Sequence, residues 1–211
     1  MMKTCKGLII EGIPGTGKTS LLEKLRQDNI GQKLKCSSEF IFSEEITQRV
    51  LEKQFNDGKL DKTNNIKLLE DIISPLENYQ LKLLNRGWSH LQFYYILERF
   101  HLTHVSYYSY LGWEDVEDID NRLYNLGSKV CLLTMKDKVF SDRLINRRGE
   151  PWRKYLSRYG KTEKEIIKHY INQQKDLIEL TRKTKLPLLM IDTTYMSLEE
   201  IYKKIINFFI E

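Results

Sequence analysis

Residues 12–19 contain a pattern that is typical of phosphate binding. They read Gly-Ile-Pro-Gly-Thr-Gly-Lys-Thr, which matches G-x-x-x-x-G-K-[ST], and Ser20 follows. The glycines let the backbone turn at positive φ, so that a row of N–H groups points at one anion. In this pattern the Lys18 ammonium reaches the β- and γ-phosphates of a nucleotide, and the Thr19 hydroxyl ligates Mg²⁺. The residues predicted to bind ATP are Gly12, Ile13, Pro14, Gly15, Thr16, Gly17, Lys18, Thr19 and Ser20.

The segments on either side of this loop agree with that interpretation. Residues 6–11 form a short apolar run of the strand type, and residues 20–26 place leucines at helical spacing. Strand, glycine loop and helix therefore follow one another in the order that a phosphate-binding loop requires. The alternative is a glycine-rich turn that binds no ligand.

Apolar runs alternate with helical stretches along the rest of the chain. Strands are expected at residues 7–11, 39–43, 92–97, 129–135 and 186–191. Strands that alternate with helices predict an α/β fold, with a parallel sheet and helices on both of its faces. In such sheets ligands bind beside the carboxyl ends of the strands, so the residues that follow each strand are candidates for the site.

Proline, glycine and serine predict where the helices break and begin. Pro75 is expected to kink or divide the helical region 45–86, and Gly87 is expected to end it. Ser197 and Glu200 have the spacing of a capping box, so they predict the start of the last helix.

Length and composition limit the classes of protein that fit. The 211 residues suit one domain, which we take as 1–211, with a lid segment at 137–160. The net charge is +5, but the lysines and arginines are scattered among 29 acidic residues, which argues against a nucleic-acid partner. Three cysteines without a C-x-x-C pair indicate a reducing compartment, and no apolar run approaches the length of about 20 residues that spans a membrane. We therefore expect a soluble cytoplasmic protein, and the sequence leaves open whether it forms a homodimer.

An acidic residue and an arginine end the strand expected at 92–97. The magnesium ion of a phosphate-binding loop needs a carboxylate at the end of a nearby strand. Glu98 is the stronger candidate for this role, and Asp192 is the second. Arg99 follows Glu98 directly and would face an anionic oxygen. We predict that Glu98 and Arg99 act in catalysis; the alternative is a surface ion pair at the strand end.

Residues 137–160 are basic and loop-like, and they contain arginines that we expect to close over the phosphates. Arg143 and Arg147 are four residues apart, so they would share one face of a helix. Mobile guanidinium groups can neutralise the charge that develops during phosphoryl transfer and can exclude water. We predict catalytic roles for Arg143 and Arg147; the alternative is a basic, solvated helix.

Two glutamates, Glu44 and Glu45, follow the strand expected at 39–43. A carboxylate at this strand end can accept the proton of an acceptor hydroxyl. The sequence does not decide which of the two points inward, and we prefer Glu45 only slightly. Both, together with Arg99, are predicted to contact the acceptor.

Histidines and aromatic residues near these strand ends have simpler explanations. His101 and His104 are three residues apart on an expected helix, but further ligands for a zinc ion are lacking nearby. Tyr107 belongs to an aromatic cluster that we interpret as packing, with stacking on a substrate ring as the alternative. Trp152 would either cover the site or anchor its loop.

Residues 96–104, which read Ile-Leu-Glu-Arg-Phe-His-Leu-Thr-His, together with the loop 12–19 resemble the thymidylate kinase and deoxynucleoside kinase group of P-loop kinases. The resemblance implies the P-loop NTPase fold with strand order 2-3-1-4-5, an arginine-bearing lid and an adenine-binding loop after the last strand. It also implies a glutamate after the second strand that accepts the proton of the acceptor. The chain lacks the Glu-Pro that commonly follows this strand in the group, and it lacks the arginine that usually precedes the acid in thymidylate kinases. The identity of the acceptor therefore stays open.

These features predict a phosphotransferase that uses ATP and Mg²⁺ and moves the γ-phosphoryl group to a small-molecule acceptor. The acceptor would be a nucleoside, a nucleoside monophosphate or another small hydroxyl compound, such as an antibiotic or a sugar. One alternative is a nucleotide-hydrolysing switch or motor module, although the Asn-Lys-x-Asp motif of guanine-specific switches is absent from the sequence. A helicase or packaging subunit fits less well, because the chain is short and lacks a basic stripe.

Overall fold

A parallel sheet forms the centre of the protein. The computed structural model describes residues 4–51, 60–88, 90–146 and 149–210, and in them five strands pair in the order β2-β3-β1-β4-β5. All neighbouring strands are parallel. The strands are β1 (Cys5–Glu11), β2 (Ser38–Phe42), β3 (Phe93–Glu98), β4 (Ser128–Thr134) and β5 (Leu188–Asp192). The predicted α/β fold with strand order 2-3-1-4-5 is confirmed.

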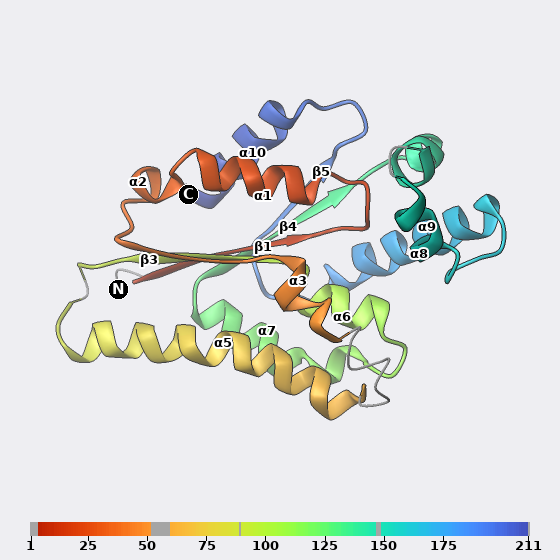
Figure 1. The fold of residues 1–211 in the computed structure, drawn as a ribbon. Helices are drawn as coiled ribbons and strands as arrows, with labels where there is room; N and C mark the ends of the chain where they lie inside the picture. The colour runs from red at the N-terminus through yellow and green to blue at the C-terminus, as the bar shows by residue number, and fades with distance from the viewer. Residues whose placement is uncertain (1–3, 52–59, 89, 147–148, 211) are drawn as a thin grey trace.

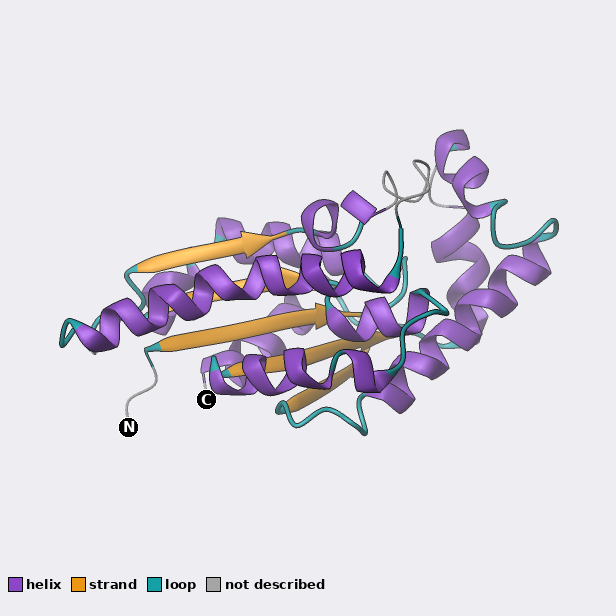
Figure 2. Cartoon of the chain, turned by 90° about the horizontal axis from the view of Figure 1, so that it is seen from below, coloured by secondary structure: helices purple, strands orange, loops and turns teal. Residues whose placement is uncertain are grey.

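Helices cover both faces of this sheet. Figure 1 shows α1 (Lys18–Gln27) and α10 (Leu198–Ile210) on one face, and α5 (Lys62–Asn85) and α7 (Glu117–Asn125) on the other. In Figure 2 the strand arrows point toward the same end of the molecule, as a parallel sheet requires. The remaining helical segments are α2 (Ile30–Leu34), α3 (Glu44–Thr47), α6 (His101–Tyr107), α8 (Glu150–Leu156) and α9 (Glu163–Leu180), the 3₁₀ turns η1 (Trp113–Asp115) and η2 (Asp137–Val139), and the π-helical turn η3 (Ser141–Asn146). Within the described ranges, no helix is both long enough and apolar enough to cross a membrane.

The central strands are buried because helices lie on both sides of them. Every residue of β3 is buried, whereas the edge strand β5 is largely exposed. Along β1 the side chains alternate between two apolar layers: Leu8 and Ile10 pack with α1 and α10, and Ile9 packs with α5, α7 and α9. Continuous apolar runs are therefore the expected pattern of these strands.

A glycine in β1 makes room for a contact between its two neighbouring strands. Gly7 is paired with Tyr95 on one side and with Ser128 on the other, so the three residues form a row across the sheet. The Tyr95 hydroxyl reaches over Gly7 and hydrogen-bonds to the Ser128 hydroxyl. A Cβ on Gly7 would lie 2.5 Å from the Tyr95 hydroxyl oxygen and 2.8 Å from Ser128 Oγ.

Two helix boundaries follow the predicted signals, and one does not. The amide of Ser197 donates to the Glu200 carboxylate over 2.7 Å, and the amide of Glu200 donates back to Ser197 Oγ over 3.3 Å, which confirms the capping box. Gly87 adopts φ 70° just after α5, as a helix-ending glycine does. However, α5 is not divided at Pro75 but continues through it. The lost backbone hydrogen bond is outweighed by the apolar side chains that α5 buries on both sides of the proline, at Leu69, Ile72, Ile73 and Leu76.

The segment 137–160 is helical over much of its length, which corrects the expectation of a loop. It contains η2, η3 and α8. Phe140, Leu144 and Leu156 are buried in the apolar layer that also holds α5 and α9. These apolar residues are widely spaced among charged ones, so the basic composition concealed the helical turns that tertiary packing stabilises.

Replacement of Gly7 by alanine should destabilise the fold, because the new methyl group collides with Tyr95 and Ser128. We expect a loss of about 1–3 kcal/mol in the free energy of unfolding, measured by urea denaturation. Gly149→Ala is the matched control, since among the described residues its Cβ would meet nothing closer than Pro151 Cδ at 3.8 Å. Equal stability of the Gly7→Ala variant and the control would contradict the packing described here.

Candidate active site

The loop between β1 and α1 has the backbone shape of an anion nest. Gly12, Gly15 and Gly17 adopt φ values of 141°, 86° and 95°. A Cβ on Gly12 would lie 2.5 Å from the carbonyl oxygen of Leu133, whereas the Cβ direction of Gly17 has no heavy atom within 4 Å. The Lys18 ammonium donates to the carbonyl of Ile13 over 2.9 Å and so lies across the loop. Three residues at positive φ and the start of α1 meet here, as phosphate binding requires.

A hydroxyl and a carboxylate meet beside this loop. Thr19 Oγ1 donates to Glu98 Oε1 over 3.3 Å, and Glu98 is 1% exposed. Oxygen ligands of this kind suit Mg²⁺, which usually takes one or two protein ligands together with phosphate oxygens and water. The described ranges contain no group of three or more His, Cys, Asp or Glu residues that could hold a metal ion. The carboxylate of Asp192, the second candidate, instead accepts from the Thr194 amide over 2.9 Å.

Arg99 turns the chain sharply at the end of β3. Its φ is 55°, a left-handed conformation that is uncommon for a residue other than glycine, and its amide donates to the Ile10 carbonyl over 3.0 Å. The side chain is buried: Nε lies 2.8 Å from Glu44 Oε2, and Nη1 donates to Gln48 Oε1 over 3.3 Å. The alternative of a surface ion pair between Glu98 and Arg99 is therefore wrong, since both are buried and the guanidinium pairs with Glu44.

A buried carboxylate that the sequence analysis overlooked holds this turn in place. Glu11, the last residue of β1, is 0% exposed. Its Oε1 accepts from the amides of Phe100 at 3.0 Å and Thr103 at 3.4 Å, and its Oε2 accepts from the Thr103 hydroxyl. Because Gly12 follows it, Glu11 joins the phosphate loop to the turn that carries Arg99. A polar residue at the end of an apolar strand was the signal that could have found it.

The two glutamates after β2 face different surroundings. Glu44 Oε1 lies 2.5 Å from Arg49 Nη2, while its other oxygen contacts Arg99. Glu45 is exposed and pairs with Arg49 at 3.1 Å. The slight preference for Glu45 is wrong, because α3 begins at Glu44 and the next residue points about 100° around the helix, toward solvent.

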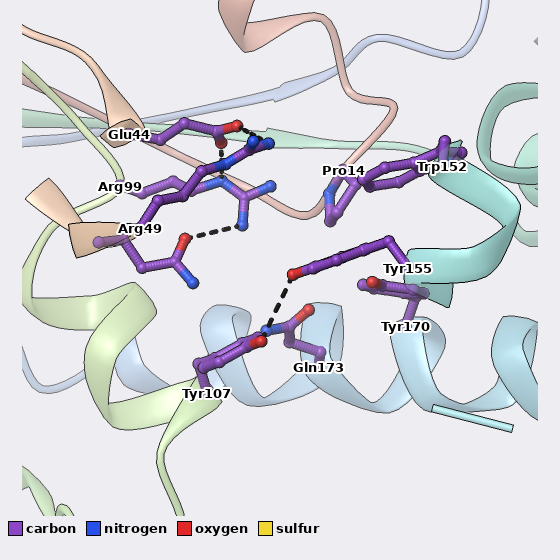
Figure 3. A pocket seen from close by; sticks show the side chains of 10 residues that line it. Pro14, Glu44, Arg49, Arg99, Tyr107, Trp152, Tyr155, Tyr170 and Gln173 are labelled. Atoms are coloured by element: carbon purple, nitrogen blue, oxygen red, sulfur yellow. Dashed lines mark hydrogen bonds and ion pairs between the residues drawn. The ribbon is translucent and has the colours of Figure 1, made fainter. Parts of the chain in front are cut away.

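Two adjoining pockets meet at these residues. The phosphate pocket is lined by Pro14, Gly15, Gly17, Lys18, Thr19, Ser20, Glu44, Arg49, Arg99 and Trp152. The aromatic pocket is lined by Pro14, Glu44, Gln48, Arg49, Arg99, Tyr107, Trp152, Tyr155, Tyr170 and Gln173, and Figure 3 draws it. Five residues line both pockets, so a group bound in one pocket would contact a group bound in the other.

Aromatic rings and an amide form the walls of the aromatic pocket. Trp152 and Tyr155 stack with ring centroids 5.1 Å apart and planes 18° from parallel. The Tyr155 hydroxyl lies 3.4 Å from that of Tyr107, across the pocket in Figure 3. Gln173 is 5% exposed, and its buried amide oxygen has no hydrogen-bond partner among the described residues. The walls thus offer flat apolar surfaces and an amide that is available to a ligand.

Of the two lid arginines, only Arg143 lies within the described residues, and Arg147 lies outside them. Arg143 donates to the Thr193 and Thr194 carbonyls over 2.9 and 2.8 Å, and it is not among the residues that line either pocket. Its own carbonyl oxygen would be 3.3 Å from a Cβ on Gly15. Arg143 therefore ties the π-helical turn to the loop after β5, next to the phosphate loop.

Burial and charge determine the protonation of two central groups. Burial, and then the neighbouring Arg99 guanidinium, lower the pKa of Lys18 to about 7 from its ordinary value of 10.5. Burial alone would raise the pKa of the Glu44 carboxyl, but Arg99, Lys18 and Arg49 outweigh it and lower the pKa. Glu44 is thus a carboxylate at neutral pH, whereas Lys18 needs an anion beside it to stay fully charged.

Several pocket residues were missed by the sequence analysis. Gln48 and Arg49 follow Glu44 by four and five residues, so a helix beginning at Glu44 could have suggested them. Gln173 stands at helical spacing between Tyr170 and Leu177 on the buried face of α9. A polar residue within an apolar stripe was its signal. Trp152 of α8 was expected either to cover the site or to anchor its loop, and it lines both pockets.

Three solved structures share this fold along nearly their whole length. The YorR protein from Bacillus subtilis, solved in complex with phosphorylated GDP, is 20% identical with a TM-score of 0.55, and the match covers 96% of this chain and 94% of that one. Thymidylate kinase from Candida albicans is 16% identical with a TM-score of 0.56, over 97% and 91% of the two chains. Thymidylate kinase from Ehrlichia chaffeensis is 13% identical with a TM-score of 0.57, over 97% and 98%. No family model matches the chain, and no curated protein matches its sequence.

The sheet order and the glycine loop define a P-loop NTPase fold. Within that class, the fold is the one found in thymidylate kinases and in YorR. The resemblance inferred from the sequence is therefore confirmed for the fold.

Nucleotide binding at alkaline pH should take up a proton, because phosphate groups beside Lys18 raise its pKa from about 7 back toward the ordinary value. At pH 8.5 the ammonium of the free protein is largely deprotonated, so binding of ADP should take up about one proton per site. Calorimetry of ADP binding in two buffers of different ionisation enthalpy measures this uptake. At pH 6 the uptake should nearly vanish. Equal heats in both buffers at pH 8.5 would contradict the lowered pKa.

Proposed function

We propose that this protein is a Mg²⁺- and ATP-dependent phosphotransferase whose acceptor binds in the aromatic pocket. The observation that carries the proposal is the boundary between the two pockets, which Arg99, Glu44 and Arg49 share with Pro14 and Trp152. A donor on the phosphate loop and an acceptor in the aromatic pocket would meet there. Such positioning, with charge neutralisation, supplies most of the catalysis in phosphoryl transfer.

The donor half of the proposed reaction uses the phosphate loop. The loop amides would hold the phosphates of ATP, and Lys18 would contact the β- and γ-phosphates in its charged form. Thr19 and Glu98 would hold the magnesium ion, which when bound neutralises phosphate charge. Arg99, buried at the pocket boundary, would stabilise the negative charge that builds up as the phosphoryl group moves.

The acceptor half favours a flat ring. Trp152, Tyr155 and Tyr170 give the aromatic pocket surfaces on which a heterocycle can stack, and the Gln173 amide can exchange hydrogen bonds with its edge. Glu44 is ionised and would accept the proton of the acceptor hydroxyl. We therefore favour a nucleoside or a nucleoside monophosphate over a sugar.

The lid would cover both pockets with residues that line them. We propose 137–160 as this lid, since Trp152 and Tyr155 of α8 line the aromatic pocket. Arg143 would support the loop after β5, which the resemblance assigns to adenine binding. Roles for Arg143 and Arg147 in catalysis stay predictions.

A screen of ADP formation across nucleosides, nucleoside monophosphates and aminoglycoside-like compounds tests the proposal. ADP formation should depend on one class of acceptor, and mass spectrometry should find that acceptor phosphorylated. Lys18→Ala is the negative control, because it removes the charge that holds the β- and γ-phosphates and should therefore form no ADP. ADP formation that no acceptor accelerates would instead favour the nucleotide-hydrolysing switch.

Replacement of Arg99 should reduce turnover far more than ATP affinity, because its charge acts on the moving phosphoryl group. We expect Arg99→Ala to lower kcat about 100-fold or more, while the Kd for ATP changes less than about threefold. Arg99→Asn is the companion variant, since asparagine tolerates the left-handed backbone. Loss of ATP binding with an unchanged fold would place Arg99 on the donor side.

Replacement of Gln173 should weaken acceptor binding. Gln173→Leu keeps the size of the side chain but removes the amide, so the KM for the acceptor should rise about tenfold or more. Gln174→Leu is the matched control. The Gln174 side chain accepts from the Met135 amide and donates to the Met135 carbonyl, each over 2.9 Å, so it supports the fold and not a ligand. An unchanged acceptor KM in Gln173→Leu would remove this residue from the site.

A further inference from the structure

The short helix α3 carries much of the acceptor site. Glu44 is its first residue, and Gln48 follows its last. Both contact the Arg99 guanidinium, at 2.8 and 3.3 Å. One helical turn of four residues is too short to be stable by itself, so tertiary contacts must hold it.

Those contacts converge on Thr47 and on the end of β3. The Glu44 amide donates to Glu98 Oε2 over 3.2 Å, and the Thr47 hydroxyl donates to the backbone carbonyl of Glu98. The carbonyl of Thr47 lies 2.8 Å from Nε2 of His104 on α6. Both Thr47 and His104 are 0% exposed.

The chemistry of the imidazole determines the direction of these hydrogen bonds. A carbonyl only accepts, so Nε2 of His104 must carry the proton. Burial lowers the pKa of His104 to about 4, so the ring is neutral and Nδ1 is an acceptor. Nδ1 lies 2.5 Å from Asn65 Oδ1. A neutral ring protonated on Nε2 has no proton to donate to this oxygen, so we assign the Asn65 amide the orientation turned by 180°, with its N–H₂ toward the ring.

The remaining Asn65 atom completes the chain. The other end of the amide, at Nδ2, lies 3.1 Å from the Tyr110 hydroxyl. In the turned orientation this end is the amide oxygen, which accepts from Tyr110. Hydrogen bonds then run in one direction, from Tyr110 to Asn65, to His104 and to Thr47. This chain ties α3 to α5, α6 and the segment after α6, and none of its side chains lines either pocket.

We infer that His104 is a positioning residue that holds α3 in register, so that Glu44 and Gln48 face the acceptor. The inference rests on the proposed function for its effect on turnover, but not for its effect on α3. Donation from Nε2 is the essential feature, because an unpaired Thr47 carbonyl in this buried place would favour release of the helix.

Two substitutions of His104 test the hydrogen bonds of its two ring nitrogens separately. His104→Asn reproduces the Nδ1 side and loses the donor to Thr47, whereas the longer amide of His104→Gln can still reach it. In His104→Asn the acceptor KM should rise about tenfold and kcat should fall, with the Kd for ADP within about threefold. Hydrogen exchange of peptides that cover residues 43–51 should increase, while that of residues 12–20 should not. His104→Gln should restore both readouts in large part.

The neighbouring histidine provides a matched control. His101 is equally buried on the same helix, but its Nε2 pairs with Asp120 at 3.0 Å, away from α3. His101→Gln should leave the acceptor KM and the exchange of residues 43–51 unchanged. Unaltered exchange and KM in His104→Asn would overturn the inference.

A spectroscopic measurement tests the inference without any variant and without an activity assay. ¹⁵N spectra of the native protein at pH 6 should show His104 neutral with the proton on Nε2. A charged ring, or one protonated on Nδ1, would overturn the inference even if His104→Asn fails to fold. If the tautomer and the hydrogen-exchange changes are as expected but the protein transfers no phosphoryl group, the proposed function is wrong and the inference about His104 stands.

Discussion

The turn at Arg99 is the constraint on which the site depends. A left-handed arginine costs on the order of 1–2 kcal/mol, and it persists only where the surroundings fix it. Here the Ile10 carbonyl holds its amide, and the Glu11 carboxylate holds the next amide and the start of α6. Because Ile10 and Glu11 lead directly into the phosphate loop, the position of the guanidinium is coupled to that loop through the backbone.

This turn gathers charges that the fold would not need for stability. Arg99 and Glu44 are both removed from most of the solvent, and a buried ion pair seldom stabilises a protein more than well-packed apolar side chains would. Lys18 is buried beside them with a lowered pKa. Like charges held close together at strand ends store electrostatic energy that an anionic ligand relieves, which is the behaviour of a binding site.

The aromatic pocket is assembled from segments that lie far apart in the sequence. The aromatic pocket joins α3, α6, α8 and α9, and Pro14 is the residue of the phosphate loop that lines it among the described residues. Structures of thymidylate kinases and YorR share the architecture at 13–20% identity. At that distance the likeness shows the fold alone.

The sequence by itself determined the strands of the sheet and the phosphate loop, because apolar runs and glycine spacing are local signals. The strand order came from the resemblance to P-loop kinases. It also marked Glu98 and Arg99 as a strand-end pair. Only the tertiary structure decided that Glu44 rather than Glu45 faces inward, that residues 137–160 are largely helical, and that Gln173 lines the pocket. Each of these depends on packing between helices distant in sequence, and residue spacing within one segment carries no information about its neighbours in space.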